Sequence, residues 1–166
     1  MNRSSLALNF AWSALICLAA CRAPVEANDD RASSLEADFG RGTVLITADD
    51  GQQYEFDVWL AESAAQQRRG LMFVREMPPM TGMLFVYDKD DYRSMWMKNT
   101  YISLDMVFAR QDGRISSVIH ETQPRSLASQ ASSEPVTYVL ELNAGTARRL
   151  QIGNRSRLEW TADDDD

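Results

Sequence analysis

Three polar residues stand inside an apolar, strand-forming stretch of the chain. They are Lys98, Asn99 and Asp105 in "RSMWMKNTYISLDMVFA". Burying a charge without a partner is costly, so each charge must be paired, turned to water or kept for a ligand. Alternation along a strand places Trp96 on the face of Lys98, and a turn at 99–103 would bring Lys98 within reach of Asp105. The segment therefore predicts either a structural ion pair or a ligand site in which Lys98 is the cationic anchor and Trp96 packs beside it. A carboxylate or sugar ligand would need such a site.

Two further polar residues, Arg69 and His120, are expected at the edge of this candidate site. His120 is the single histidine of the chain, and a lone histidine is usually a hydrogen-bonded residue rather than a ligand. Asp105, Glu121 and Glu141 offer carboxylates for a hydrolase, but no spacing selects a catalytic pair. A serine nucleophile elbow is absent, and the usual Cys/His set for zinc cannot be assembled. We therefore expect no cofactor, and catalysis by carboxylates is kept only as an alternative function.

The methionines offer a second alternative. Met77, Met80 and Met83 are spaced three apart in "MPPMTGM", and Met97 follows Trp96. Thioethers suit Cu(I), and His120 could complete such a site. The competing interpretation is that these methionines fill the core, which is the common use of this residue. A Met-rich Cu(I)-binding protein is therefore a further hypothesis.

The N-terminus has the layout of a secretory signal. Arg3 is the only charge before the apolar stretch from Leu6 to Ala20, which is too short to span a bilayer. The stretch ends in Leu-Ala-Ala-Cys21, which resembles the bacterial lipobox and implies that Cys21 is lipidated and becomes the first mature residue. The only other cysteine, Cys17, would be removed, so a lipid also explains an otherwise unpaired thiol in an oxidising compartment. An ordinary cleaved signal is the alternative, and Arg22 favours the outer over the inner membrane.

Four segments are expected in the chain: a lipoprotein signal peptide at 1–20, a flexible tether at 21–39, a single β domain at 40–162 and an acidic tail at 163–166. Removing the signal leaves 146 of the 166 residues, enough for one domain with a core. It also removes Arg3, so the net charge changes from −7 to about −8. An acidic surface argues against binding nucleic acid or anionic lipid. We expect a monomer that contacts the membrane only through the lipid on Cys21.

Between the termini the hydrophobic pattern has mostly a period of two. "TVLIT" and "QYEFDVWLA" are joined by "ADDGQ", which indicates a β-hairpin. With these two, the pattern predicts about eight short strands in total. Two short helices interrupt them: one with Ser63 as N-cap and Gln66 three residues on, the other with Asn143 as cap and Gly153 beyond its end. The pattern predicts a mainly β fold, a β-sandwich or jelly-roll-like partly closed barrel with two short helices.

The blocks "RRGLMFVRE", "GMLFVY", "WMKNTYISLDMVF" and "YVLELNAG" occur in that order. In this the chain resembles the bacterial and archaeal family called domain of unknown function 192, from about residue 58 to residue 158. The resemblance implies a compact, mainly β, jelly-roll-like fold, and it supplies no established activity. The chain departs from the family pattern at Ser103, where members usually carry proline, and at Asn154, where they usually carry aspartate.

These observations predict a lipid-anchored protein on the periplasmic side of the cell envelope. We expect it to act as a non-catalytic binding module for a small-molecule or envelope-derived ligand. Its site would be formed by Trp96, Lys98, Asn99 and Asp105, with Arg69 and His120 at the edge. The alternatives are the envelope hydrolase and the Cu(I)-binding protein described above.

Overall fold

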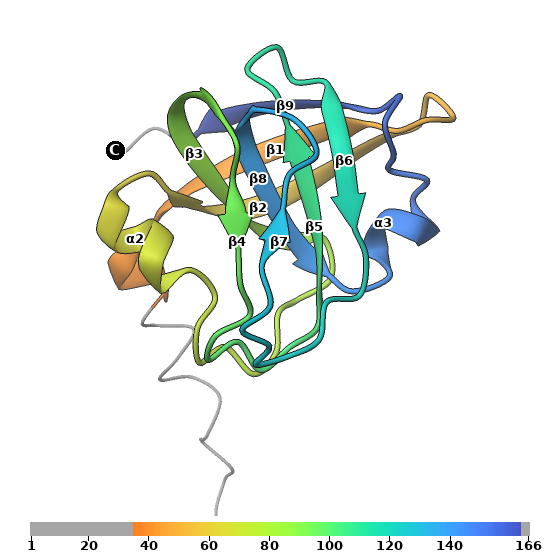
Figure 1. Cartoon of the computed structure of the whole chain (residues 1–166). Coiled ribbons are helices and arrows are strands. Elements are labelled where there is room, and N and C mark those ends of the chain that lie inside the picture. The colour runs from red at the N-terminus through yellow and green to blue at the C-terminus, as the bar shows by residue number, and fades with distance from the viewer. Residues whose placement is uncertain (1–34, 164–166) are drawn as a thin grey trace, which may run out of the picture.

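A seven-stranded sheet that curls on itself organises the part of the chain that the structure, a computed structural model, describes, residues 35–163 (Figure 1). The strand order is β6-β5-β8-β3-β2-β1-β9, and a separate two-stranded sheet pairs β4 with β7. The strands are β1 (Gly40–Thr47), β2 (Gln53–Ala61), β3 (Thr81–Asp91), β4 (Ser94–Met95), β5 (Leu104–Ala109), β6 (Ile115–Ile119), β7 (Gln130–Ala131), β8 (Val136–Asn143) and β9 (Arg157–Ala162). Two short helices accompany the strands, α2 (Ala64–Arg69) and α3 (Thr146–Arg149). The predicted mainly β fold is confirmed.

Local sequence signals account for the first elements. β1 and β2 form the predicted antiparallel hairpin, in register from Gly40 opposite Leu60 to Thr47 opposite Gln53. α2 has the predicted capping box, because the Ser63 hydroxyl accepts the Gln66 N–H while the Gln66 side chain accepts the Ser63 N–H. α2 lies in the connection between β2 and β3, which are the one parallel pair of the large sheet.

The inner side of the curled sheet holds the first of two apolar clusters, called here the barrel core. Every strand of the large sheet contributes to it, and α3 adds Ala147. Its strand members are Val44, Ile46, Phe56, Val58, Leu60, Leu84, Val107, Ala109, Ile115, Leu140, Leu142 and Leu158. The two edges of the sheet meet where Gly113 accepts the N–H of Leu158 at 2.8 Å and Ile115 donates to Ser156 at 3.2 Å. These contacts produce the expected partial closure into a barrel.

The outer face of the central strands carries the second cluster, called here the outer core. Its strand members are Trp59, Ala61, Met83, Phe85, Leu104, Met106, Phe108, Val136 and Val139. Loops cover it and contribute buried side chains such as Leu71, Met77 and Met97. Leu35 and Phe39 also pack into it, so the chain joins the domain before residue 40, inside the segment expected to be a tether.

Two predicted elements differ from the structure. The strand expected to carry Trp96 and Lys98 is reduced to Ser94–Met95, and the chain turns at Asn99, which has a left-handed φ of 56°. The second helix has Gly145 as its N-cap, with a φ of 80°. Asn143 is therefore not the cap, and its side chain instead donates to the Met77 carbonyl at 2.9 Å.

The predicted signal peptide, Cys21 and most of the predicted tether lie outside the described residues, as does the end of the acidic tail. Within residues 35–163, no helix is long and apolar enough to cross a bilayer.

Candidate functional site

The predicted pairing of Lys98 with Asp105 is wrong. β5, which carries Asp105, is hydrogen-bonded to β6 on one side and β8 on the other, so no edge is left for the segment around Lys98. Asp105 is fully buried, whereas Lys98 is exposed and its Nζ lies 5.2 Å from the centre of the Trp96 ring. The antiparallel arrangement assumed from the sequence required a strand that the chain does not form.

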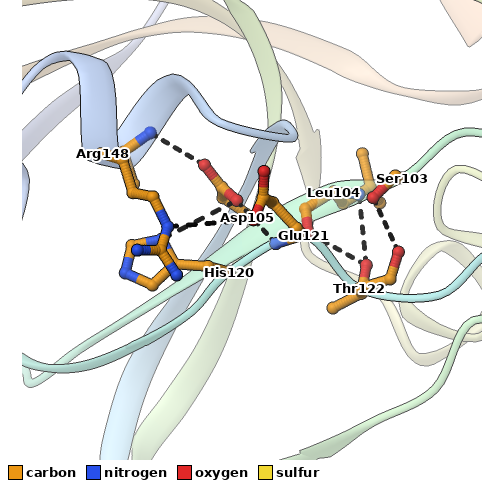
Figure 2. A network of polar contacts seen from close by, with 8 residues as sticks. Ser103, Leu104, Asp105, His120, Glu121, Thr122 and Arg148 are labelled. Atoms are coloured by element: carbon orange, nitrogen blue, oxygen red, sulfur yellow. Dashed lines mark hydrogen bonds and ion pairs between the residues drawn. The ribbon is translucent and has the colours of Figure 1, made fainter.

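Asp105 instead fixes a helix and a loop to β5 (Figure 2). Its Oδ2 accepts the N–H of Ala147 at 2.8 Å, and its Oδ1 accepts the N–H of Glu121 at 2.9 Å. Ala147 belongs to the first turn of α3, so the carboxylate satisfies an N–H that the helix itself leaves unpaired. His120 Nδ1 lies 3.9 Å from Asp105 Oδ1. This geometry gives Asp105 a structural role, with both oxygens already used.

The neighbouring Thr122 holds the same loop to the start of β5. Its hydroxyl accepts the N–H of Leu104 at 3.1 Å and lies 3.0 Å from the Leu104 carbonyl (Figure 2). The hydroxyl of Ser103 donates to the Thr122 carbonyl at 2.7 Å. A proline could not make this last contact, so the residue that departs from the family pattern has a hydrogen bond of its own.

Three loops meet at one end of the molecule, and each contains a non-glycine residue in the left-handed region. These residues are Phe73 (φ 69°), Asn99 (φ 56°) and Arg125 (φ 60°). The loops are joined by backbone hydrogen bonds, from Phe73 N–H to the Asn99 carbonyl at 2.8 Å and from Arg125 N–H to the Thr100 carbonyl at 3.0 Å. Such backbone is uncommon for a bulky residue like phenylalanine, and strain of this kind clusters at functional sites.

Exposed aromatic rings and cations gather on two of these loops, and we call Phe73, Arg75, Trp96, Lys98 and Tyr101 the loop face. The exposed fractions are 43% for Phe73, 50% for Trp96 and 38% for Tyr101. Phe73 and Tyr101 meet edge to face with ring centres 6.1 Å apart. The Arg75 guanidinium lies 5.2 Å from the Tyr101 ring centre, as Lys98 does from Trp96. Rings flanked by cations can stack on a ligand and hydrogen-bond its anionic groups.

The residues predicted to form one site are therefore divided. Trp96, Lys98 and Asn99 remain together on one loop, and His120 lies beside Asp105. Arg69 is the last residue of α2, with its Nη1 3.8 Å from Asp38. Sequence reasoning missed Phe73, Arg75 and Tyr101 as site residues. The block "RRGLMFVRE" contains two of them, but nothing in the sequence places it beside Asn99.

Glu141 is a second unusual group, on the outer face of β8. It is 4% exposed, although carboxylates are rarely buried without a partner. No hydrogen bond or ion pair joins its side chain to another of the described residues, and burial raises its pKa to about 8. Tyr87 is close enough that the Glu141 charge raises the pKa of its phenol, which burial raises more strongly and Arg93 lowers. Asp105 and Glu141 project from opposite faces of the sheet, so they cannot act as a catalytic pair.

The five residues of the predicted metal set do not meet. Met77, Met83 and Met97 are buried in the outer core, and Met80 packs against the barrel core instead. His120 lies beside Asp105. The carboxylate of Asp105 projects from the face of the sheet that is opposite the outer core. Met77 is buried although two prolines follow it in the chain. Among residues 35–163 there is no group of three or more His, Cys, Asp or Glu side chains placed to hold a metal ion.

A curled antiparallel sheet with one parallel pair, closed at one seam and overlaid by loops, defines a small, mainly β domain. The chain belongs to the family of domain of unknown function 192 (DUF192), described as an uncharacterized ACR, whose sequence model matches residues 45–160. The family resemblance seen in the sequence blocks is thereby confirmed.

Two solved structures are similar to the chain. One is a protein of Sinorhizobium meliloti 1021, provisionally described as a transcription regulator, with 42% identity and a TM-score of 0.72; the match covers 74% of this chain and 95% of that one. The other is a protein of unknown function from Novosphingobium aromaticivorans DSM 12444, with 34% identity, a TM-score of 0.68 and coverage of 71% and 84%. A search of curated proteins gave no match.

Proposed function

We propose that the protein is a lipid-anchored, non-catalytic binding module of the cell envelope, and that its loop face binds an envelope saccharide carrying carboxylate groups. The observation that carries the proposal is the loop face itself, where exposed rings are presented by strained backbone. Phe73 combines a φ of 69° with an exposed fraction of 43%, so its conformation costs free energy that burial of the ring does not offset.

The chemistry of the loop face favours this class of ligand. Aromatic rings stack on the apolar faces of sugar rings, and arginine and lysine donate charge-assisted hydrogen bonds to carboxylates. Arg75 and Lys98 both lie over rings, where they combine the two functions. The whole chain has a net charge of −7, so these two cations form a local positive region that attracts an anionic group.

The provisional description of the Sinorhizobium protein is not adopted for this chain. A protein that binds DNA neutralises phosphates with a basic surface, and here 24 acidic residues outnumber 17 basic ones. The location on the periplasmic side, with the outer membrane favoured, is supported by the signal-like N-terminus and the lipobox ending at Cys21. The proposed ligand is of a kind found in that compartment.

Titration of the protein with uronic-acid oligosaccharides and muropeptides, followed by calorimetry, tests the proposal. We expect binding that weakens at least tenfold in Trp96→Ala and Lys98→Ala. Tyr92→Ala is the matched control, because Tyr92 is 68% exposed but directly follows β3, outside the loop face. Equal binding by all four proteins, or no binding of any carboxylated saccharide, would reject the loop face as the site.

A further inference from the structure

We infer that Glu141, Met83 and Met106 form a binding site for a soft monovalent metal ion, Cu(I) or its analogue Ag(I). Glu141 in β8 stands directly opposite Met83 in β3 and Met106 in β5, as the registers of the two strand pairs show. Both methionines are fully buried members of the outer core. Residues directly opposite on neighbouring strands have Cβ atoms about 4.5–5.5 Å apart, so two flexible thioethers flank one carboxyl group.

The side-chain directions along the three strands agree with this arrangement. In β8, Leu140 and Leu142 belong to the barrel core while Val139 belongs to the outer core, so Glu141 projects to the outer face. Met83 and Met106 belong to the outer core as well. The carboxylate and both sulfur atoms therefore lie on the same side of the sheet.

The donor set fits a soft ion of single charge. Thioethers select Cu(I) over hard divalent ions, and one carboxylate neutralises its single positive charge inside an apolar layer. Binding exchanges the carboxyl proton of Glu141 for Cu(I) and releases that proton to water, with no change in the oxidation state of the metal. Burial without a partner is then explained, because the ion is the missing partner of Glu141.

The loop layer that covers the sheet adds another buried methionine, Met97, to the outer core. Met97 is fully buried in the outer core, and its sulfur lies 3.2 Å from the Thr122 hydroxyl. That hydroxyl has one proton, for which the Leu104 carbonyl at 3.0 Å is the closer acceptor. Thr122 therefore stays paired with Leu104 even without the Met97 sulfur. This site uses neither Met80 nor His120, which the sequence hypothesis required.

The test measures Cu(I) affinity by competition with bicinchoninate, under anaerobic conditions. All proteins carry Cys17→Ser and Cys21→Ser, because free thiolates would bind Cu(I) themselves. The variants are Glu141→Gln, which is isosteric with the protonated acid, and Met83→Leu with Met106→Leu, which conserves volume. Met80→Leu is the matched control, since Met80 packs against the other core.

We expect the parent and Met80→Leu to bind one Cu(I) equally, and the two site variants to bind at least tenfold more weakly. X-ray absorption of the parent complex should show sulfur neighbours that are lost in the double methionine variant. Circular dichroism confirms folding, and Met83→Leu alone replaces the double variant if that variant unfolds. Absence of Cu(I) binding by the parent, or equal affinity in Glu141→Gln, would overturn the inference. Loss of saccharide binding at the loop face would leave it unaffected.

Discussion

At the scale of single residues, Asp105 shows how backbone N–H groups hold a buried carboxyl group in place. Its two oxygens accept N–H groups from Ala147 and Glu121, neither of which has another partner in a helix or strand ladder. Asp105→Leu would leave both groups unpaired, at a cost of about 1–3 kcal/mol each. Lys98→Met should be nearly neutral, because the Lys98 side chain is exposed and its Nζ lies beside the Trp96 ring.

The double variant Lys98→Met with Asp105→Leu therefore tests whether Asp105 is stabilised by the backbone N–H groups or by an ion pair with Lys98. We expect its free energy of unfolding in urea to equal that of Asp105→Leu alone, with a coupling energy near zero. An ion pair essential to the fold would instead make the double variant more stable than Asp105→Leu. Asp105→Asn, which keeps one acceptor oxygen, should fall between Asp105→Leu and the parent.

Glu141 makes a different prediction, on the dependence of stability on pH. Its pKa is about 8 in the folded protein against 4.5 for an ordinary glutamate. Between these values the folded state keeps the proton that the unfolded state has lost. The free energy of unfolding therefore decreases as pH rises from about 4.5 to 8, by a few kcal/mol in total.

Urea unfolding of the parent and Glu141→Gln across pH 5–8.5 measures this contribution. Titrations that the two proteins share cancel in the difference. We expect Glu141→Gln to gain stability over the parent steadily as pH rises. A difference that stays constant with pH would mean that Glu141 titrates at its ordinary pKa in the folded protein.

The residue scale also shows what sequence reasoning cannot supply. Trp96 and Lys98 were predicted to share a face, and they lie side by side, with the Lys98 Nζ 5.2 Å from the centre of the Trp96 ring; their role in binding a ligand stays a prediction. The partner of Asp105 could not be predicted, since it is a backbone N–H of α3, distant in sequence. Glu141 was noticed as a carboxylate, but its burial between Met83 and Met106 depends on strand pairings that no local pattern specifies.

At the scale of elements, glycine turns determine how the sheet closes. Gly51 and Gly113 both have a φ of 82°. A Cβ on Gly113 would collide with the Leu158 carbonyl at the seam between β6 and β9, whereas a Cβ on Gly51 would meet nothing within 4 Å. The two positions therefore share the same backbone strain and differ in the steric contact.

Gly51→Ala and Gly113→Ala form a matched pair of variants. Gly51→Ala should cost about 1–2 kcal/mol for its left-handed conformation alone. Gly113→Ala should cost an additional 1–3 kcal/mol, because the seam must move apart. Thermal unfolding measures both, and equal losses would show that the seam adds nothing to stability.

Elements determined by neighbouring residues were predicted well. The hairpin of β1 and β2 and the capped start of α2 each depend on a few adjacent residues. The strand expected around Trp96 failed because β5 already had two partners, leaving only Ser94–Met95 to pair with the distant β7. α3 begins later than predicted because Gly145 adopts a left-handed conformation that propensity does not reveal.

At the scale of the whole molecule, the large sheet separates the barrel core on its inner side from the outer core on its other face. The inner side holds the barrel core and the buried Asp105, whose carboxylate accepts backbone N–H groups. The outer core contains Glu141 and the methionines beneath loops, and the loop face lies at the end where those loops cross. Variants of the loop face and of Glu141 should therefore affect saccharide and metal binding separately.

The proposed lipid anchor on Cys21 belongs to this largest scale, because it would determine where in the cell the domain is held. Cys21 precedes the first described residue, Leu35, which already packs into the outer core. We expect Cys21→Ser to move the protein from the membrane to the soluble fraction and to abolish labelling by palmitate. Thermal unfolding and loop-face binding should stay unchanged. Cys17→Ser is the control, since Cys17 would leave with the signal peptide; membrane retention of Cys21→Ser would mean that something other than the lipid holds the protein there.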